Sequence, residues 1–360
     1  MIHSPDDAAL DDLCDALAQR AGETDRSGAW PAEQLRLCGE AGVYRWFLPK
    51  EYGGDAWGAE AVVRGYLKLS AACLTTTFVI TQRTAACRRL ALSDNANLKA
   101  RLLPALAAGD AFATVGISHL TTSGLHLGAP RLAAERTSSG WRLSGVAPWA
   151  TGAAAADTLV LGASVVEGGQ ATGDELLVAV DKHTPGLAVP EPFSLVGVSA
   201  SSTGAVNLAD ATVAEEDVIA GPTQKVLAAP GRGASTGGHE TSTLALGLAG
   251  AALEYLGKEA GKRDDLGEAS AALSAEHAEL VADLLSIARG EPACSNESLR
   301  TRANSLVLRA TQAALSAAKG AGYVAGHPVG RWCREALFFM VWSCPQPVAA
   351  ANLCELAGIE

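Results

Sequence analysis

The chain has 360 residues, of which 48% are hydrophobic and 19% are charged, and its formal net charge at pH 7 is −11. A chain of this length can bury about two or three packed units. Because the excess negative charge repels phosphate backbones, we expect no nucleic-acid partner. No run approaches the ~20 apolar residues of a membrane span, and residues 1–25 are acidic and amphipathic, so we expect neither a membrane helix nor a secretory signal.

The eight cysteines are scattered along the chain, without a C-x-x-C pair and without histidines at metal-ligand spacing. This pattern indicates reduced thiols and no structural metal. We therefore expect a cytoplasmic protein that holds no zinc.

Residues 1–111 are predicted to form a helical domain. Ser4 and Pro5 have the residue types favoured at the N-cap and at the first position of a helix. Leucines from Leu10 onward then recur on one helical stripe, and similar spacing continues through most of this segment.

Residues 112–221 are predicted to form a sheet or barrel domain. Short runs typical of β-strands, separated by Gly, Ser and Pro, cover residues 131–137, 140–144, 158–166 and 175–181. The sequence pattern therefore changes from one typical of helices to one typical of β-strands at about Phe112.

The last third returns to helical patterns. Residues 222–238 are rich in Gly, Pro, Ser and Thr and are predicted to be a linker. Residues 239–360 are predicted to form a helical bundle, in which an alanine-rich helix runs from about Leu299 to the glycines Gly320 and Gly322. Helices first, strands in the middle and helices last indicate segregated layers and not alternating βαβ units.

Four strings then occur in the order known from one flavoenzyme family. Residues 48–54 read LPKEYGG and residues 97–110 read NLKARLLPALAAGD. Residues 140–151 read GWRLSGVAPWAT, and residues 320–336 begin with GAGY and end with RWCREA. Over its whole length the chain resembles the acyl-CoA dehydrogenase family.

The resemblance implies a helical N-terminal domain, a middle β-barrel or sheet domain and a C-terminal domain similar to a four-helix bundle. It implies that FAD binds between the β domain and the bundle of a homodimer or homotetramer. The implied substrate is an acyl thioester carried by CoA or by an acyl carrier protein, and the implied electron acceptor is a flavoprotein or a reductase.

Trp149 and Thr151 match the family residues that lie against the flavin ring. An indole offers a stacking face, and a hydroxyl or its backbone N–H can hydrogen-bond the flavin edge. The alternative is a core tryptophan beside a strand threonine.

Two further sets of residues match cofactor-binding positions less closely. Ser118 and Ser123 lie in a loop whose hydroxyls can donate hydrogen bonds to a flavin or its pyrophosphate, although His119 replaces the expected glutamate. A solvated loop is the alternative there. Gly320 and Gly322 would let backbone N–H groups approach a cofactor phosphate, or they form an ordinary helix C-cap.

The catalytic base is the largest departure from the family pattern. Ser343 stands where the family carries its glutamate, and a serine hydroxyl is a poor base for an α proton. Cys344 is interpreted as a small buried residue and not as a nucleophile. A second family position for the base falls on Gly237, and Glu240 lies one helical turn later. Glu240 is the candidate base, or it is a first-turn glutamate that the helix dipole favours.

The pyrophosphate-binding residues of the family are also incomplete. The arginine usually found upstream of residues 244–249 falls on Gly238, and Lys262 and Arg263 are the nearest possible substitutes. A solvated basic patch is the alternative for this pair.

Three functions follow from these matches and departures. The first is an FAD-dependent oxidoreductase that acts on the CH–CH group of an acyl thioester. The second is a reduced-flavin-dependent monooxygenase on the same fold, which needs no α-proton base. The third is a non-catalytic flavin-binding or partner-binding paralogue. The intact strings favour the first, whereas Ser343 and the altered loop after Ile117 favour the other two.

Overall fold

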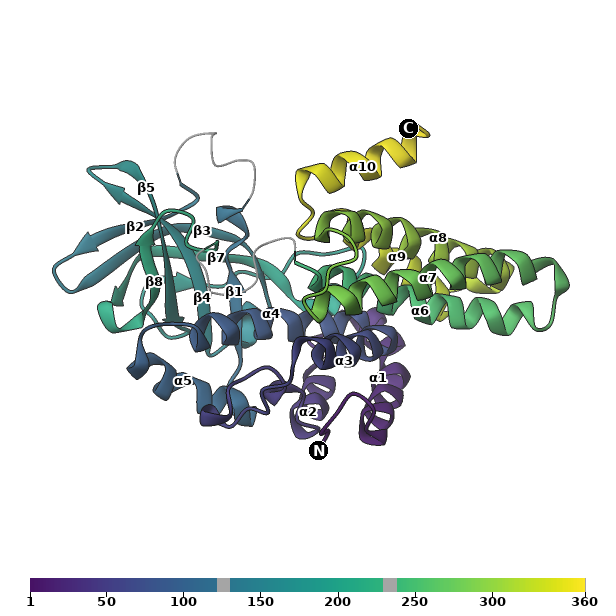
Figure 1. Ribbon diagram of the computed structural model, residues 1–360. Coiled ribbons are helices and arrows are strands. Elements are labelled where there is room, and N and C mark those ends of the chain that lie inside the picture. Colours follow the sequence, from purple (N-terminus) through teal and green to yellow (C-terminus); the bar gives the residue numbers. More distant parts are fainter. Residues whose placement is uncertain (122–129, 229–237, 360) are drawn as a thin grey trace.

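A computed structural model describes residues 1–121, 130–228 and 238–359. Three parts lie side by side in it: N-terminal helices, a twisted sheet and a bundle of long C-terminal helices (Figure 1). This arrangement confirms the fold class expected from the sequence. Within the described ranges, no helix combines the length and the apolar composition that crossing a membrane requires.

The N-terminal part consists of five helices and two short 3-10 turns. The helices are α1 (Ala8–Ser27), α2 (Ala32–Glu40), α3 (Ala59–Ala72), α4 (Leu74–Ala91) and α5 (Ala96–Ala108), and the turns are Val43–Arg45 and Lys50–Tyr52.

The first helix begins later than predicted. Asp7, not Ser4, is its N-cap, and the Asp7 carboxylate accepts a hydrogen bond from the backbone N–H of Ala9 at 3.1 Å. Ser4 instead forms a turn in which its hydroxyl accepts from the N–H of Asp6. A carboxylate three residues further on therefore displaces the serine from the cap, because a charged acceptor hydrogen-bonds the free N–H groups more strongly and also favours the helix dipole.

The middle part is one eight-stranded sheet. Its strands are β1 (Ala113–Gly116), β2 (Leu132–Thr137), β3 (Gly140–Thr151), β4 (Thr158–Glu167), β5 (Gln170–Asp181), β6 (Leu187–Ala188), β7 (Thr203–Ala214) and β8 (Val218–Thr223). The strand order is β6-β7-β3-β2-β4-β5-β8, and β1 pairs in parallel with β4. Alternate residues of the long strands, such as Leu159, Leu161 and Ala163, point into a shared core, which is the period-2 burial expected of a curved sheet.

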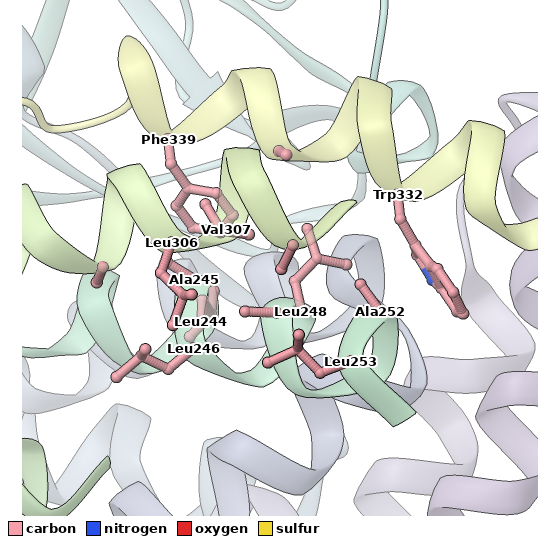
Figure 2. Close-up of a cluster of buried hydrophobic side chains, with 14 of the residues drawn as sticks. Leu244, Ala245, Leu246, Leu248, Ala252, Leu253, Leu306, Val307, Trp332 and Phe339 are labelled. Carbon is pink, nitrogen blue, oxygen red and sulfur yellow. The ribbon is translucent and has the colours of Figure 1, made fainter. Parts of the chain in front are cut away.

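The C-terminal part contains α6 (Glu240–Ala260), α7 (Gly267–Ala288), α8 (Asn296–Gly322), α9 (Pro328–Ala336) and α10 (Gln346–Ala357). Leu244 and Leu248 of α6 pack against Leu306 and Val307 of α8, and Phe339 covers one end of this core (Figure 2). The alanines of α8 allow this close helix contact, as its composition predicts. The last helix, α10, lies along the outside of the bundle (Figure 1).

Helix α4 holds the three parts together. Its second half contributes Ala86, Cys87 and Leu90 to a core that it shares with the sheet. Its first half contributes Leu74 and Phe78 to the core of the bundle. Burial on nearly all sides explains why α4 lacks a clear apolar stripe.

Candidate flavin and substrate site

An exposed aromatic pair lies near the end of β3. The Trp149 side chain is 52% exposed and that of Phe193 is 41% exposed, and their ring centroids are 4.9 Å apart in an edge-on arrangement. The segment after Phe193 reaches the bundle, where Arg334 of α9 donates a hydrogen bond to the carbonyl of Val196 at 3.2 Å. An aromatic surface therefore stands open on the segment that joins the sheet to the bundle, and it can accept a flat apolar ring.

Thr151 lies two residues beyond Trp149 and is buried. Its hydroxyl is 2.9 Å from the hydroxyl of Thr203, which is in turn 2.8 Å from that of Ser201. The backbone carbonyl of Thr151 accepts from the hydroxyl of Thr114 in β1 at 2.6 Å. Because a hydroxyl has one donor and two acceptor positions, Thr151 keeps capacity for one further partner.

The turn after β1 carries two buried polar atoms that have no hydrogen-bond partner among the residues that the structure describes. They are Oγ of Ser118 and Nδ1 of His119, in the 3-10 turn Ser118–Leu120. Nε2 of His119 donates to the carbonyl of Gly162 at 2.6 Å, which leaves Nδ1 as an acceptor. Burial lowers the pKa of His119, so the ring is neutral at pH 7.

Ser118 Oγ and His119 Nδ1 thus offer one donor and one acceptor to a ligand, since buried polar groups are ordinarily satisfied. The sequence indicated Ser118 as a hydroxyl donor, but it gave His119 no role. Ser123, the second predicted hydroxyl, lies outside the described residues.

The predicted phosphate turn lies at the end of α8. Lys319 leaves helical geometry there, with φ 54° and ψ −147°, and Tyr323 just beyond the turn is almost fully exposed. A Cβ on Gly322 would come within 2.7 Å of the Cβ of Ala318, whereas a Cβ on Gly320 would meet no atom. The need for glycine at position 322 therefore comes from packing against its own helix. That geometry is the one expected of the alternative, helix-terminal interpretation.

Glu240, the candidate base, is the first residue of α6 and forms an ion pair with Arg88 of α4. Oε1 of Glu240 is 3.1 Å from Nη1 of Arg88, and both side chains are between a quarter and a third exposed. One carboxylate oxygen is therefore already engaged by a guanidinium. Gly237, the other family position on this helix, lies outside the described residues.

Ser343 lies far along the chain, in the turn before α10, with φ 47°. Two buried side chains of α8 hold this turn in place by hydrogen bonds. Nη2 of Arg300 donates to the carbonyls of Phe339 and Trp342 at 3.1 and 2.9 Å, and Nδ2 of Asn304 donates to that of Phe339 at 3.1 Å. Burial lowers the pKa of Arg300 to about 10.

The sequence analysis missed this support of the Ser343 turn. The available signal was the spacing of Arg300 and Asn304, which places two polar residues one helical turn apart on an otherwise apolar face of α8.

A second buried charge lies in α9. Arg331 and Glu335 form an ion pair with Nε and Oε2 3.6 Å apart, and both residues are buried. Desolvation raises the pKa of Glu335 to about 7. The backbone of Glu335 lies against Gly197, in the segment that leads from Phe193 to the bundle. This carboxyl therefore belongs to the joint between sheet and bundle. The family string that ends at residue 336 contains both residues, but it gave the pair no role.

Comparison with known proteins shows which family the chain resembles. Residues 7–110 match the model of the acyl-CoA dehydrogenase N-terminal domain. The glutaryl-CoA dehydrogenase of Desulfococcus multivorans is 25% identical over 365 aligned residues, which cover 93% of this chain and 90% of that protein. Residues 7–110 thus match that family's N-terminal domain, and over nearly its whole length the chain is similar to acyl-CoA dehydrogenases.

Solved structures of the acyl-CoA dehydrogenase fold agree over nearly the whole chain. A glutaryl-CoA dehydrogenase in complex with glutaryl-CoA superposes with a TM-score of 0.83 at 17% identity, covering 98% of this chain and 95% of that one. The dibenzothiophene monooxygenase of Paenibacillus sp. A11-2 superposes with a TM-score of 0.81 at 17% identity, covering 98% and 96%. These two likenesses establish the fold alone.

The relatives are named as acyl-CoA dehydrogenases, the family from which the sequence predicts FAD as cofactor. The residues at the end of the sheet fit that cofactor, because Trp149 offers an open ring face and Ser118 and His119 offer unsatisfied polar atoms. The suggested substitutes for the missing arginine fit less well. Lys262 pairs with Glu259, and Arg263 donates to the carbonyl of Ala317.

Proposed function

We propose that this flavoprotein is an oxidoreductase that acts on the CH–CH group of an acyl thioester. The observation that carries the proposal is the open Trp149–Phe193 surface, which lies on the segment that joins the sheet to the bundle. The relative from Desulfococcus multivorans, which aligns over nearly its full length, is named as a dehydrogenase of a CoA thioester. The substrate is an acyl thioester of CoA or of an acyl carrier protein.

The reaction removes a proton from the α carbon and a hydride from the β carbon. FAD, when bound, supplies the acceptor for the hydride. Trp149 would support the flavin ring, and the hydroxyls of Ser118 and Thr151 would hold the cofactor through hydrogen bonds. Glu240 is the proposed base for the α proton, and it must exchange its contact with Arg88 for one with the substrate.

We further propose a cytoplasmic homodimer or homotetramer that passes electrons to a separate flavoprotein or reductase. Gly320 and Gly322 would then carry a turn that approaches the FAD phosphates of a neighbouring subunit. Exposed Tyr323 and Val324 beside this turn support a contact of that kind. Light scattering of the flavin-loaded protein tests the assembly, and a flavin-loaded monomer would contradict it.

An absorption spectrum followed by an anaerobic titration tests the proposed reaction. The purified protein should bind FAD, and acyl thioesters should bleach the flavin absorbance near its visible maximum. A protein that binds FAD but is not bleached by thioesters of any chain length would contradict the dehydrogenase proposal.

A reduced-flavin-dependent monooxygenase is the second candidate, and one observation favours it. Position 343 carries a serine, and the carboxylate of Glu240 is engaged by Arg88, so neither position presents a free base. A monooxygenase of the same fold superposes over nearly the whole chain. Turnover with NADH-reduced flavin and oxygen, in a protein that thioesters do not bleach, would support it. Flavin binding without turnover in either assay would leave the non-catalytic paralogue.

A further inference from the structure

Three buried hydroxyl groups form a chain where β3 ends and β7 begins. Thr151 and Thr203 lie directly opposite each other in the antiparallel pairing of these strands, and their hydroxyl oxygens are 2.9 Å apart. Ser201, at the end of the 3-10 turn before β7, places its hydroxyl 2.8 Å from that of Thr203. The exposed fraction is 4% for Thr151, 7% for Thr203 and 0% for Ser201. This chain, which we call the hydroxyl relay, therefore runs from a fully buried serine to Thr151.

Backbone hydrogen bonds hold the relay in place beside the open aromatic surface. The carbonyl of Thr151 accepts from the hydroxyl of Thr114 in β1 at 2.6 Å. The carbonyl of Thr203 accepts at 2.9 Å from the N–H of Phe193, whose ring stands edge-on to that of Trp149. The hydroxyls therefore keep their spacing as long as the sheet is intact.

The number of protons fixes the direction of the relay. Three hydroxyls carry three protons but share two hydrogen bonds, so one proton is left for a partner outside the relay. Within residues 1–121, 130–228 and 238–359, the hydroxyls of Ser201 and Thr203 have no partner outside the relay. A spare proton on either of them would be buried without an acceptor, which is unfavourable.

The Thr151 end is where the spare proton can meet an acceptor. Thr151 lies two residues after Trp149, at the surface proposed for the flavin, and the edge of a flavin ring carries nitrogen and carbonyl acceptors. With an acceptor there, Ser201 donates to Thr203 and Thr203 donates to Thr151, and all three protons are used. Because each hydrogen bond polarises the next, the Thr151 hydroxyl becomes a stronger donor than an isolated one.

We propose that Thr203 and Ser201 are positioning residues, which orient the hydroxyl of Thr151 as a hydrogen-bond donor to bound FAD. The inference rests on the FAD site of the proposed function, but not on which reaction takes place there. FAD, when bound, supplies the redox chemistry, and the relay contributes to its affinity and its reduction potential.

A double-mutant cycle on FAD binding tests the relay. Thr151→Val and Thr203→Val each replace a hydroxyl by a methyl group, and quenching of flavin fluorescence measures the affinity for FAD. Thr151→Val should weaken binding by about tenfold, and Thr203→Val by about threefold, because the second change removes the orientation of the donor and not the donor itself. Since Thr203 acts through Thr151, the double variant should bind FAD about as tightly as Thr151→Val alone.

The reduction potential of bound FAD is a second readout, which a purely structural role of Thr203 would not move. Equilibration with reference dyes measures it. Thr203→Val should shift the potential in the same direction as Thr151→Val, but by less. A tenfold change in the relative affinity for oxidised and reduced FAD corresponds to a shift of about 30 mV.

Three further variants make the result specific. Thr203→Ser keeps the hydroxyl and should retain the wild-type affinity and potential. Ser201→Ala removes the first donor of the relay and should act in the same direction as Thr203→Val, which it replaces if that variant does not fold. Thr84→Val is the matched control, because it breaks a buried contact of 2.6 Å between the hydroxyls of Thr84 and Tyr66 among the N-terminal helices. It should leave FAD affinity unchanged.

The outcomes separate the relay from the proposed function. Wild-type affinity and potential in Thr203→Val and Ser201→Ala would overturn the relay and leave the proposed function intact. An additive loss in the double variant would overturn it too, because Thr203 would then act independently of Thr151. Unchanged FAD binding in Thr151→Val would remove the donor on which the relay depends. Wild type that binds no FAD would overturn the proposed function, and the relay with it.

Discussion

The end of the sheet and the turn before α10 differ in how far their polar and aromatic groups already have partners within the protein. At the end of the sheet, Trp149 is open to solvent and Ser118 and His119 keep unsatisfied polar atoms. In the turn, Phe338 and Trp342 stack on each other, and Arg300 donates a hydrogen bond to the carbonyl of Trp342. The first region is ready for a ligand, whereas the second is already filled by the protein itself.

This difference indicates which half of the family's chemistry the chain has kept. The residues that fit a flavin are present, and the residue that would take the α proton is replaced by Ser343. Binding a flavin and performing the dehydrogenation are separable properties. Each prediction below tests one of the two regions or the joint between them.

The largest effect is expected from returning a carboxylate to the filled region. Ser343→Glu should raise the rate at which butyryl-CoA bleaches the flavin by about 10³-fold, because a positioned base contributes that much to proton transfer. Anaerobic stopped-flow absorbance measures the rate. Ser343→Gln provides a side chain of the same size as glutamate without its basicity. If Ser343→Gln accelerates bleaching as much as Ser343→Glu does, the added base is not the cause.

Glu240→Gln in the wild-type background tests whether the residual rate depends on the ion-paired carboxylate. The substitution keeps the shape of the side chain and removes the basic oxygen. It should abolish bleaching if Glu240 is the base. An unchanged rate would remove Glu240 from the mechanism.

The stability of the protein should depend on pH through Glu335, which lies at the joint between the sheet and the bundle. Its pKa is about 7 in the folded protein and near 4.5 when unfolded, so the folded state holds more protons between these values. The Glu335 contribution to stability is complete below about pH 4.5 and is lost as pH rises through 7, by about 3 kcal/mol in all. Denaturant unfolding at pH 5, 6, 7 and 8 measures the slope.

Glu335→Gln should remove this part of the pH dependence. Glu254→Gln is the control, because Glu254 forms an exposed ion pair with Lys258 on the outside of α6. Equal pH slopes for wild type and Glu335→Gln would show that Glu335 does not titrate in this range.

At the open region, Trp149→Ala should weaken FAD binding by about tenfold, because it removes the stacking surface. Flavin fluorescence quenching on titration measures the affinity. Trp57→Ala truncates a tryptophan that stacks on Trp46 in the N-terminal helices, and it should leave FAD affinity unchanged. If both variants bind FAD like wild type, the ring lies elsewhere.

The smallest effect is expected from Ser118→Ala. Its hydroxyl has no partner among the described residues, so removing it should leave the unfolding free energy of the apoprotein unchanged or slightly higher. FAD affinity should nevertheless fall by about threefold to tenfold, because a hydrogen bond to the cofactor is lost. Ser139→Ala, in an exposed turn between β2 and β3, is the control. A loss of apoprotein stability would mean that Ser118 is structural.

The sequence by itself determined the order of helices, strands and helices, because apolar periodicity is a local property. The family strings were likewise local. One of them contains Trp149, and the weaker matches beside them led to Ser118 and to the replacement at position 343. The start of the first helix was misplaced because Ser4 and Asp7 are both good caps, and only the competition between them in the folded chain selects Asp7.

Only the tertiary structure decided how the site is completed. Arg88 and Glu240 are 152 positions apart in the chain, and Phe78 meets Phe338 and Trp342 across more than 250 positions. Nothing in the local pattern of α4 specifies these partners, since a helix buried on nearly all sides has no distinctive stripe. The pairing depends on how α4 is enclosed by the sheet and the bundle together, and that enclosure exists only once all three parts have packed.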